Sequence, residues 1–168
     1  SRSDTEVILK AYHAWGDDCL RHFNGIWALA IWDEKQRRLF CARDRFGVKH
    51  FYYCIHDQVL YFGSEIKQLL FTPVNKSLNR PMLWRAMKIN SLQVYGAETF
   101  WNNIHALEPG TTLSVQDGQI SARTYHHLDP SIFGTSTLSL NDATDQYRKL
   151  FQRAVGWQMR SDVEVGAC

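Results

Sequence analysis

The start of the chain follows the hydrophobic period of a helix. Apolar residues recur there at helical spacing: Val7, Ile8, Ala11 and Trp15. Ser3, with Glu6 three residues later, forms the capping-box pattern that begins helices. Gly16-Asp17-Asp18 breaks the period. We therefore expect a helix that begins after Ser3 and ends near Gly16, with a short second turn through residues 20–23.

From residue 25 to residue 125 the pattern favours paired strands. It predicts three hairpins, formed by residues 25–32 with 39–42, 51–55 with 59–62, and 111–115 with 119–125. Polar residues separate the strands of each pair, and Asp117-Gly118 is a strong hairpin signal. Residues 25–32 are apolar at odd and even positions alike, which predicts a strand buried on both faces.

Helices are expected between and after these hairpins. A short helix should begin at Ser64-Glu65, and a second should cover residues 82–89 with Pro81 in its first turn. Residues 129–137 are rich in Pro, Ser, Gly and Thr and predict a linker. Residues 140–159 then keep a clear helical period, with Ser139 or Asn141 as the cap. The pattern as a whole predicts an α+β fold with a largely antiparallel sheet.

Composition places the chain among ordinary globular proteins. Its 168 residues are 45% hydrophobic and 21% charged, which is enough apolar material for a core. A formal net charge of +2 gives no reason to expect nucleic acid or an anionic membrane surface as a partner. No apolar run approaches the ~18–20 residues of a membrane span, and the polar first residues do not resemble a signal peptide. We therefore expect a cytoplasmic protein with reduced cysteines.

The residue types alone indicate no catalytic centre. Arg43-Asp44-Arg45 is typical of a solvated loop with local ion pairs, which contribute ~0–1 kcal/mol when exposed. His126 and His127 would point to opposite faces of a strand, so they should not share a metal ion, and we expect no metal site. Ser1 could in principle act as a nucleophile through its own amine. We do not expect it to do so, because it stands just before a helix.

Four segments, in order, resemble the glutaminase domain of glutamine-dependent asparagine synthetase. They are SDTEVIL at residues 3–9, NGIWALAIWD at 24–33, RDRFGVK at 43–49 followed by Tyr52-Tyr53, and FGSEIK at 62–67. Leu107–Gly110, Tyr125 and the SDVEVG segment at 161–166 are similar to later motifs of that family. The departures from the family pattern are Trp27, His50, Phe51, His126 and Glu164. The shared order and spacing are far more specific than any single segment.

The resemblance implies an αββα fold of the N-terminal-nucleophile hydrolase type, in which stacked antiparallel sheets are flanked by helices. Residues 1–129 would be the later part of the glutaminase domain, 130–140 a linker, and 141–168 the first helix and strand of an α/β ATP-pyrophosphatase domain. The nucleophilic Cys would precede Ser1, and the ATP loop would follow Cys168. Residues 1–168 by themselves are therefore expected to be inactive.

The resemblance also implies the chemistry of the whole enzyme. A Cys thiolate would release ammonia from L-glutamine. The ammonia would convert β-aspartyl-AMP, made from L-aspartate and ATP with Mg²⁺, into asparagine and AMP, with pyrophosphate released. Asp4 matches the carboxylate that binds the glutamine α-ammonium, and a carboxylate in the first turn of a helix is favoured in its ionised form. Arg43, Asp44 and Glu65 would support the active site.

Other interpretations stay open beside this one. The chain could belong to a related amide-forming enzyme with another acceptor, of the lasso-peptide cyclase or β-lactam synthetase type. It could also be a non-catalytic domain that keeps the amidotransferase fold. A homodimer is neither favoured nor excluded by the sequence.

Overall fold

The computed structural model describes residues 3–89, 96–132, 134, 137–159 and 166. The chain divides into two compact units, Ser1–His127 and Leu128–Cys168. The first unit contains both sheets and the helices that pack on them, and the second contains one long helix.

The first helix begins where the capping pattern predicts. α1 spans Asp4–Trp15, and the Ser3 hydroxyl accepts a hydrogen bond from the Glu6 backbone N–H at 3.4 Å. Gly16 ends the helix with a φ of 57°, a conformation that glycine adopts at little cost. The 3₁₀ helix η1, Gly16–Arg21, follows directly and buries Cys19 and Leu20. The expected second turn is therefore present, two residues shorter than predicted at its end.

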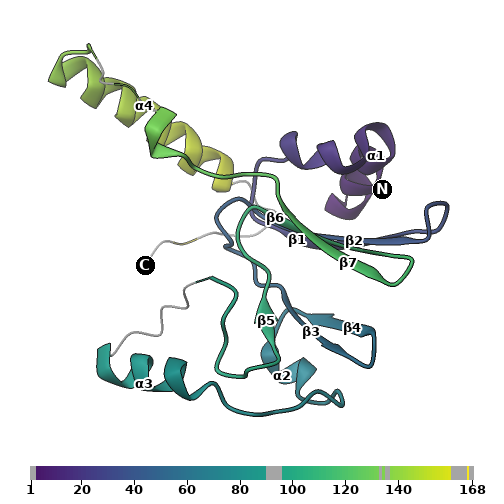
Figure 1. The fold of residues 1–168 in the computed structure, drawn as a ribbon. Coiled ribbons are helices and arrows are strands. Elements are labelled where there is room, and N and C mark those ends of the chain that lie inside the picture. Colours follow the sequence, from purple (N-terminus) through teal and green to yellow (C-terminus); the bar gives the residue numbers. More distant parts are fainter. Residues whose placement is uncertain (1–2, 90–95, 133, 135–136, 160–165, 167–168) are drawn as a thin grey trace. The chain divides into compact units, whose positions relative to one another are not determined.

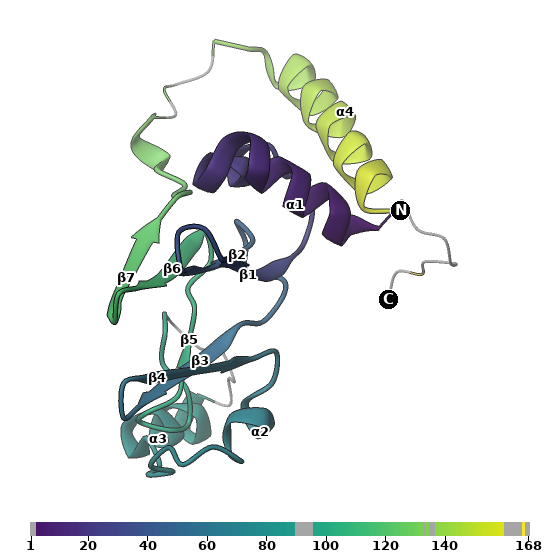
Figure 2. The same ribbon diagram turned by 90° about the vertical axis from the view of Figure 1, so that its right-hand side faces the viewer.

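A four-stranded antiparallel sheet lies next to α1 (Figures 1 and 2). Its strands are β1 (Ala28–Asp33), β2 (Arg38–Arg43), β6 (Thr111–Gln116) and β7 (Gln119–Thr124), in the order β1-β2-β6-β7. Two of the predicted hairpins form this sheet. They join through β2 and β6, where Phe40 lies opposite Ser114.

A three-stranded antiparallel sheet forms the next layer. Its strands are β3 (Tyr52–His56), β4 (Val59–Gly63) and the short β5 (His105–Ala106), in the order β4-β3-β5. The helices α2 (Ile66–Leu69) and α3 (Arg80–Ile89) belong to this side of the unit, as Figure 2 shows. The predicted hairpin and both predicted short helices are confirmed.

Three clusters of buried side chains hold these layers together. The first lies between α1 and the four-stranded sheet and centres on Phe40. The second lies between the sheets and includes Cys41, Phe51 and Leu113. The third joins the three-stranded sheet to α2 through Leu69. The first unit is therefore an α+β arrangement of two stacked antiparallel sheets with helices outside them.

The expectation that residues 25–32 form a strand buried on both faces is wrong. The strand begins at Ala28, and burial alternates along it. Leu29 and Ile31 are buried under α1, whereas Trp32 is 60% exposed. The reason is that β1 is an edge strand, and on its other face only Ala28 packs into the cluster between the sheets.

The second unit contains η2 (Pro130–Ile132) and α4 (Leu140–Gln158). The Ser139 hydroxyl caps α4 by accepting a hydrogen bond from the Asp142 backbone N–H at 3.2 Å. Of the two predicted caps, Ser139 is therefore the one that is present. Tyr147 and Phe151 stack on one face of the helix with ring centroids 5.9 Å apart. The segment at residues 161–165 and Cys168 lie outside the described residues. Among the described helices, none is long and apolar enough to cross a membrane.

Candidate functional site

The loop that follows β2 is organised by one buried carboxylate. Asp44 is 1% exposed and accepts four hydrogen bonds from backbone N–H groups. Phe46 and Val48 donate to Oδ1 at 3.1 Å each, while Trp27 and Lys49 donate to Oδ2 at 3.3 and 3.0 Å. These bonds close the loop and attach it to the segment that leads into β1. The carboxylate is thus a structural anion around which residues 44–49 fold.

The environment of Asp44 keeps it ionised. Burial by itself would raise the pKa of this carboxyl, but the four backbone donors outweigh burial and hold its pKa below the ordinary value. A carboxylate with several N–H donors has its lone pairs satisfied and does not need a cationic partner.

Arg43 is the second organiser of this loop, and it too is buried. Its guanidinium donates to three main-chain carbonyls: Lys49 through Nε at 2.7 Å, Leu107 through Nη1 at 2.6 Å and Gly47 through Nη2 at 2.6 Å. Burial lowers the pKa of Arg43, and the neighbouring Asp44 carboxylate opposes that effect. The expectation of a solvated loop with local ion pairs is therefore wrong for Arg43 and Asp44, because main-chain groups replace water around both charges.

Two further contacts attach the loop to the chain on either side of β6 and β7. The Gly110 N–H donates to the Asp44 carbonyl at 2.9 Å, and the Tyr125 hydroxyl donates to the Arg43 carbonyl at 2.8 Å. Burial raises the pKa of Tyr125 to about 12, so its hydroxyl stays a donor. The sequence pattern gave no direct sign of these contacts, although Gly110 and Tyr125 both lie in segments that resemble family motifs.

A cavity of about 540 Å³ lies beside this loop. Arg43, Gly47, His50 and Tyr52 line one part of it, and residues from α2, α3 and the 96–109 segment line the rest. His50 and Tyr52 stack with ring centroids 5.8 Å apart. Each of the three guanidinium nitrogens of Arg43 already donates to a main-chain carbonyl, so this side chain serves the structure of the loop beside the cavity.

Asp4 stands apart from the loop. It is the first residue of α1 and is exposed, and its carboxylate makes no hydrogen bond or ion pair within the described chain. The first backbone N–H groups of a helix carry partial positive charge, which favours an ionised carboxylate there. Asp4 is therefore a free anion at the N-terminal end of α1, available to a cationic ligand.

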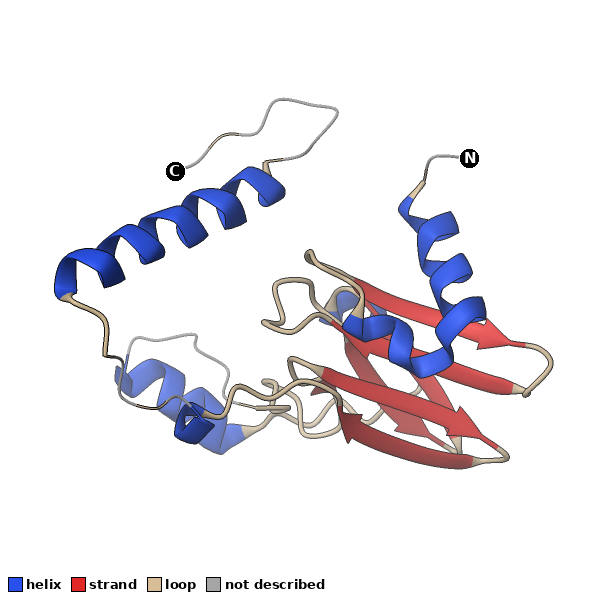
Figure 3. Cartoon of the chain, turned by 90° about the horizontal axis from the view of Figure 1, so that it is seen from above, coloured by secondary structure: helices blue, strands red, loops and turns tan. Residues whose placement is uncertain are grey.

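Glu65 is also exposed and lies on a different layer from Asp4. It precedes α2 as its N-cap residue, its N–H donates to Gln68 Oε1 at 3.0 Å, and its carboxylate forms an ion pair with Lys67. α1 packs on the four-stranded sheet and lies over its strands near the N-terminus in Figure 3, whereas α2 packs on the three-stranded sheet, as Figure 2 shows. The structure thus brings Arg43 and Asp44 together but does not bring Asp4 and Glu65 to one place.

The described cysteines do not supply a nucleophile. Cys19, Cys41 and Cys54 are free thiols with 0% exposure. Burial raises the pKa of Cys19 to about 11 and that of Cys41 to about 12, and the reactive form of cysteine is the thiolate. Within the described residues there is also no group of three or more His, Cys, Asp or Glu side chains that could hold a metal ion.

Residues 1–126 match the family described as glutamine amidotransferase domain. The chain therefore belongs to the glutamine amidotransferase domain family. This membership agrees with the two stacked antiparallel sheets and with the order of the segments that carry the resemblance.

Curated relatives extend the similarity over nearly the whole chain. It is 37% identical to asparagine synthetase (glutamine-hydrolyzing) 3 of Bacillus subtilis, over 97% of this chain and 26% of that protein. It is 31% identical to asparagine synthetase (glutamine-hydrolyzing) 1 of the same organism, over 98% and 26%. It is also 28% identical to amidase chry2 of Gibberella zeae, over 97% and 24%. The chain spans about a quarter of the length of these relatives.

Proposed function

We propose that the chain is part of a glutamine-dependent asparagine synthetase. The observation that carries this proposal is the 37% identity with the Bacillus subtilis enzyme over 97% of the chain. In the proposed reaction the side-chain amide of glutamine is hydrolysed, and the ammonia released converts ATP-activated aspartate into asparagine. Glutamate, AMP and pyrophosphate are the other products.

The first unit takes the glutamine-hydrolysing part of this reaction. Its stacked sheets support the N-terminal-nucleophile hydrolase type of fold. The attacking group is a Cys thiolate at a position outside the described residues, because the three described cysteines are buried and have no exposed sulfur. The thiolate forms a thioester with the side-chain acyl group of glutamine and expels ammonia, and water then releases glutamate from the thioester.

Asp4 binds the α-ammonium group of glutamine in this proposal. Its carboxylate is exposed and unpaired within the described chain, and it stands at the start of α1, where the ionised form is favoured. An ionised carboxylate and an ammonium form a charge-assisted hydrogen bond. This contact recognises the amino-acid end of glutamine and leaves the reacting amide free for the nucleophile.

Arg43 and Asp44 act as positioning residues. Their buried charges bind main-chain groups of the loop at residues 43–49 and of the segments near Trp27 and Leu107. They fix the backbone on which the glutamine site rests, and neither binds substrate directly. Glu65 supports the unit by capping the start of α2, away from the loop at residues 43–49.

ATP and Mg²⁺ are needed for the second half of the proposed reaction, in which ATP supplies the adenylyl group that activates aspartate. The described residues contain no candidate metal cluster, so no residue is assigned to either group. We place residues 141–168 at the start of the synthetase domain, after a linker at 130–140, and place the enzyme in the cytoplasm.

The experiment that tests the proposal supplies the full-length protein with glutamine, aspartate and ATP-Mg²⁺. Glutamate and asparagine should appear in equal amounts, and omission of aspartate should abolish asparagine formation. Absence of glutamate formation under all conditions would contradict the amidotransferase assignment and favour a non-catalytic domain.

A second candidate is an amide-forming enzyme that delivers the nitrogen to another acceptor. The similarity to amidase chry2, a relative whose name does not mention asparagine, favours keeping this candidate. The same assay separates the two. Glutamate release with no asparagine, at any aspartate concentration, would identify a different acceptor.

A further inference from the structure

One face of the four-stranded sheet is divided into an apolar half and a polar half. On β1 and β2 this face carries four apolar side chains that pack against α1, Leu29, Ile31, Phe40 and Ala42, and ends at the hairpin turn with Asp33 and Arg38. The same face of β6 and β7 carries hydroxyl, amide and guanidinium groups: Thr112, Ser114, Gln116, Gln119, Ser121 and Arg123. Directly paired residues of adjacent strands lie on the same face, so both halves are one continuous surface. The buried cluster under α1 includes only the apolar half.

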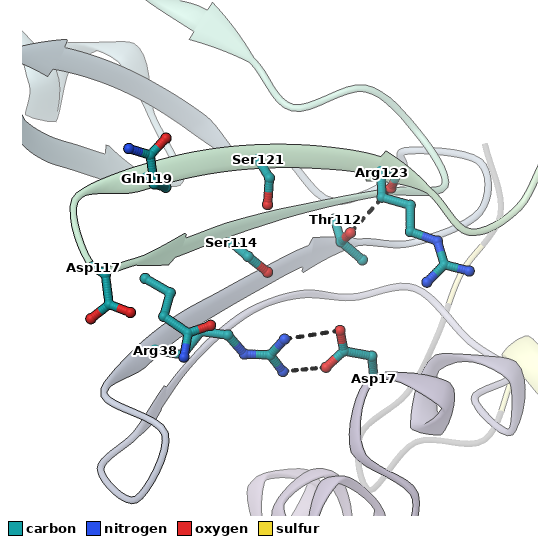
Figure 4. A pocket seen from close by; sticks show the side chains of 9 residues that line it. Asp17, Arg38, Thr112, Ser114, Asp117, Gln119, Ser121 and Arg123 are labelled. Carbon is teal, nitrogen blue, oxygen red and sulfur yellow. Dashed lines mark hydrogen bonds and ion pairs between the residues drawn. The ribbon is translucent and has the colours of Figure 1, made fainter.

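The polar half is hollowed. A cavity of about 410 Å³ lies over it, bordered by Asp17 of η1 and Arg38 of β2 (Figure 4). A second cavity, of about 170 Å³, shares Asp17, Thr112 and Arg123 with the first and extends to Arg21 and Tyr125. We call the two cavities together the polar trough. The larger one falls within the range of roughly 300–1,000 Å³ that is usual for small-molecule sites.

Two charged side chains in the polar trough, Asp117 at one end and Arg123 at the other, have no ionic partner among the described residues. Arg38 donates to both carboxylate oxygens of Asp17, and Arg21 forms an ion pair with Asp18 at 3.3 Å. Arg123 has no acidic partner among the described residues, and its side chain extends from β7 towards η1 in Figure 4. A guanidinium presents its donors in a planar arrangement that binds a carboxylate or phosphate through two parallel hydrogen bonds. Arg123 is therefore available to an anion.

Uncharged groups extend from Arg123 along the polar trough. Ser114 and Ser121 are paired across β6 and β7, and Gln119 stands two residues before Ser121 on the same face. Their side chains make no hydrogen bond within the described chain, and all three line the larger cavity. Thr112 differs, because its hydroxyl already donates to the Arg123 carbonyl at 3.1 Å. The free hydroxyl and amide groups suit a ligand that carries hydroxyls as well as a negative charge.

We propose that the polar trough binds a small hydroxylated anion. Its carboxylate or phosphate lies on Arg123, and its hydroxyl groups bind Ser114, Ser121 and Gln119. Neither Asp4 nor the loop at residues 43–49 lines this trough, so the ligand is a second molecule, distinct from glutamine. The inference is independent of the proposed function.

The test is isothermal titration calorimetry of the full-length protein at constant ionic strength. D-gluconate probes the carboxylate source and glycerol 3-phosphate probes the phosphate source, with glycerol as the uncharged control. At least one anion should bind saturably, and glycerol should not. Arg123→Gln should weaken that binding about tenfold or more, because it removes a charge-assisted pair of hydrogen bonds.

Matched variants separate a specific site from general surface charge. Lys35→Gln removes the same charge from an exposed turn outside the polar trough and should leave the affinity unchanged. Ser121→Ala should weaken the binding of gluconate but not the binding of acetate, because acetate has no hydroxyl group that could bind Ser121. Failure of both anions to bind saturably would overturn the proposal. So would equal effects of Arg123→Gln and Lys35→Gln on the anion that binds, or, where gluconate binds, equal affinities for gluconate and acetate.

Discussion

At the scale of single residues, buried charge shows where sequence reasoning succeeds and where it fails. The Ser3 cap was predictable, because a cap depends on residues only three positions apart. The burial of Arg43 and Asp44 was not predictable from residue type. Their partners include the main-chain groups of Trp27 and Leu107, which are far from them in sequence. Charged loop residues look solvated until such partners are known.

Replacing Asp4 tests the only residue proposed to contact glutamine. Asp4→Asn keeps the shape of the side chain and leaves the Ser3 cap in place, but removes the charge that faces the ammonium. A hydrogen bond to a charged group is worth about 1.5–3 kcal/mol, so glutamine-dependent kcat/KM should fall about tenfold to a hundredfold. Asparagine synthesis from free ammonia should be nearly unchanged.

The two nitrogen sources make the Asp4 result interpretable. Equal losses with glutamine and with ammonia would mean that Asp4 acts only through the structure of α1. No loss with either source would mean that Asp4 does not bind glutamine. Assays of asparagine formation with each source, in the wild type and the variant, give the answer.

Asp44→Asn tests the structural anion of the loop. The amide cannot accept the four backbone N–H bonds on two oxygens, so the free energy of unfolding at pH 7 should fall by about 2–3 kcal/mol. Asp117→Asn, the same change in an exposed turn, should have almost no effect. Urea unfolding of the three proteins measures the difference.

The stability lost in Asp44→Asn should also depend on pH in a defined direction. The folded-state pKa of Asp44 is lowered, so its contribution is complete above the unfolded value of about 3.9 and declines as pH falls through the folded pKa. The stability gap between wild type and Asp44→Asn should therefore be constant from pH 7 to pH 5 and shrink in more acidic buffer. A gap that widened on acidification would contradict this account.

At the scale of elements, the hairpins were predictable and their assembly was not. Each hairpin follows from a local alternation of apolar and polar residues and a turn such as Asp117-Gly118. The pairing of β2 with β6 has no local signal, since it joins hairpins with a second sheet between them in the chain. The burial of residues 25–32 was misjudged for the same reason, because edge position is a property of the assembled sheet.

A substitution at Gly110 tests how closely the backbone at Gly110 packs against the backbone at His126, beside the loop at residues 43–49. A Cβ on Gly110 would lie 2.4 Å from the His126 carbonyl oxygen, whereas a Cβ on Gly118 would meet nothing within 4 Å. Both residues have positive φ, at 63° and 73°. Gly118→Ala should therefore lower the free energy of unfolding only by the backbone strain, about 1–2 kcal/mol. Gly110→Ala should lower it by about 1–3 kcal/mol more, because the added Cβ overpacks the site.

Chemical denaturation of both glycine variants gives the comparison directly. The shared positive φ cancels between them, so the difference isolates the steric contact with His126. Equal losses of stability would show that the chain near Gly110 moves aside without cost.

At the scale of the whole molecule, the class of fold and the family were accessible from the sequence, and the positions of the site residues were not. The order of four short segments was enough to indicate an amidotransferase, and residues 1–126 match that family. No pattern showed that Asp4 and Glu65 lie on opposite outer layers, because layer assignment depends on which sheet each helix packs against. The polar trough was equally hidden, since β2, β6 and η1 meet only in the folded unit.

The most direct test of the central claim follows the nitrogen atom. The full-length protein is given glutamine labelled with ¹⁵N in its side-chain amide, together with aspartate and ATP-Mg²⁺. The account predicts that ¹⁵N appears in the side-chain amide of asparagine. Glutamate formation with no ¹⁵N in asparagine would contradict it.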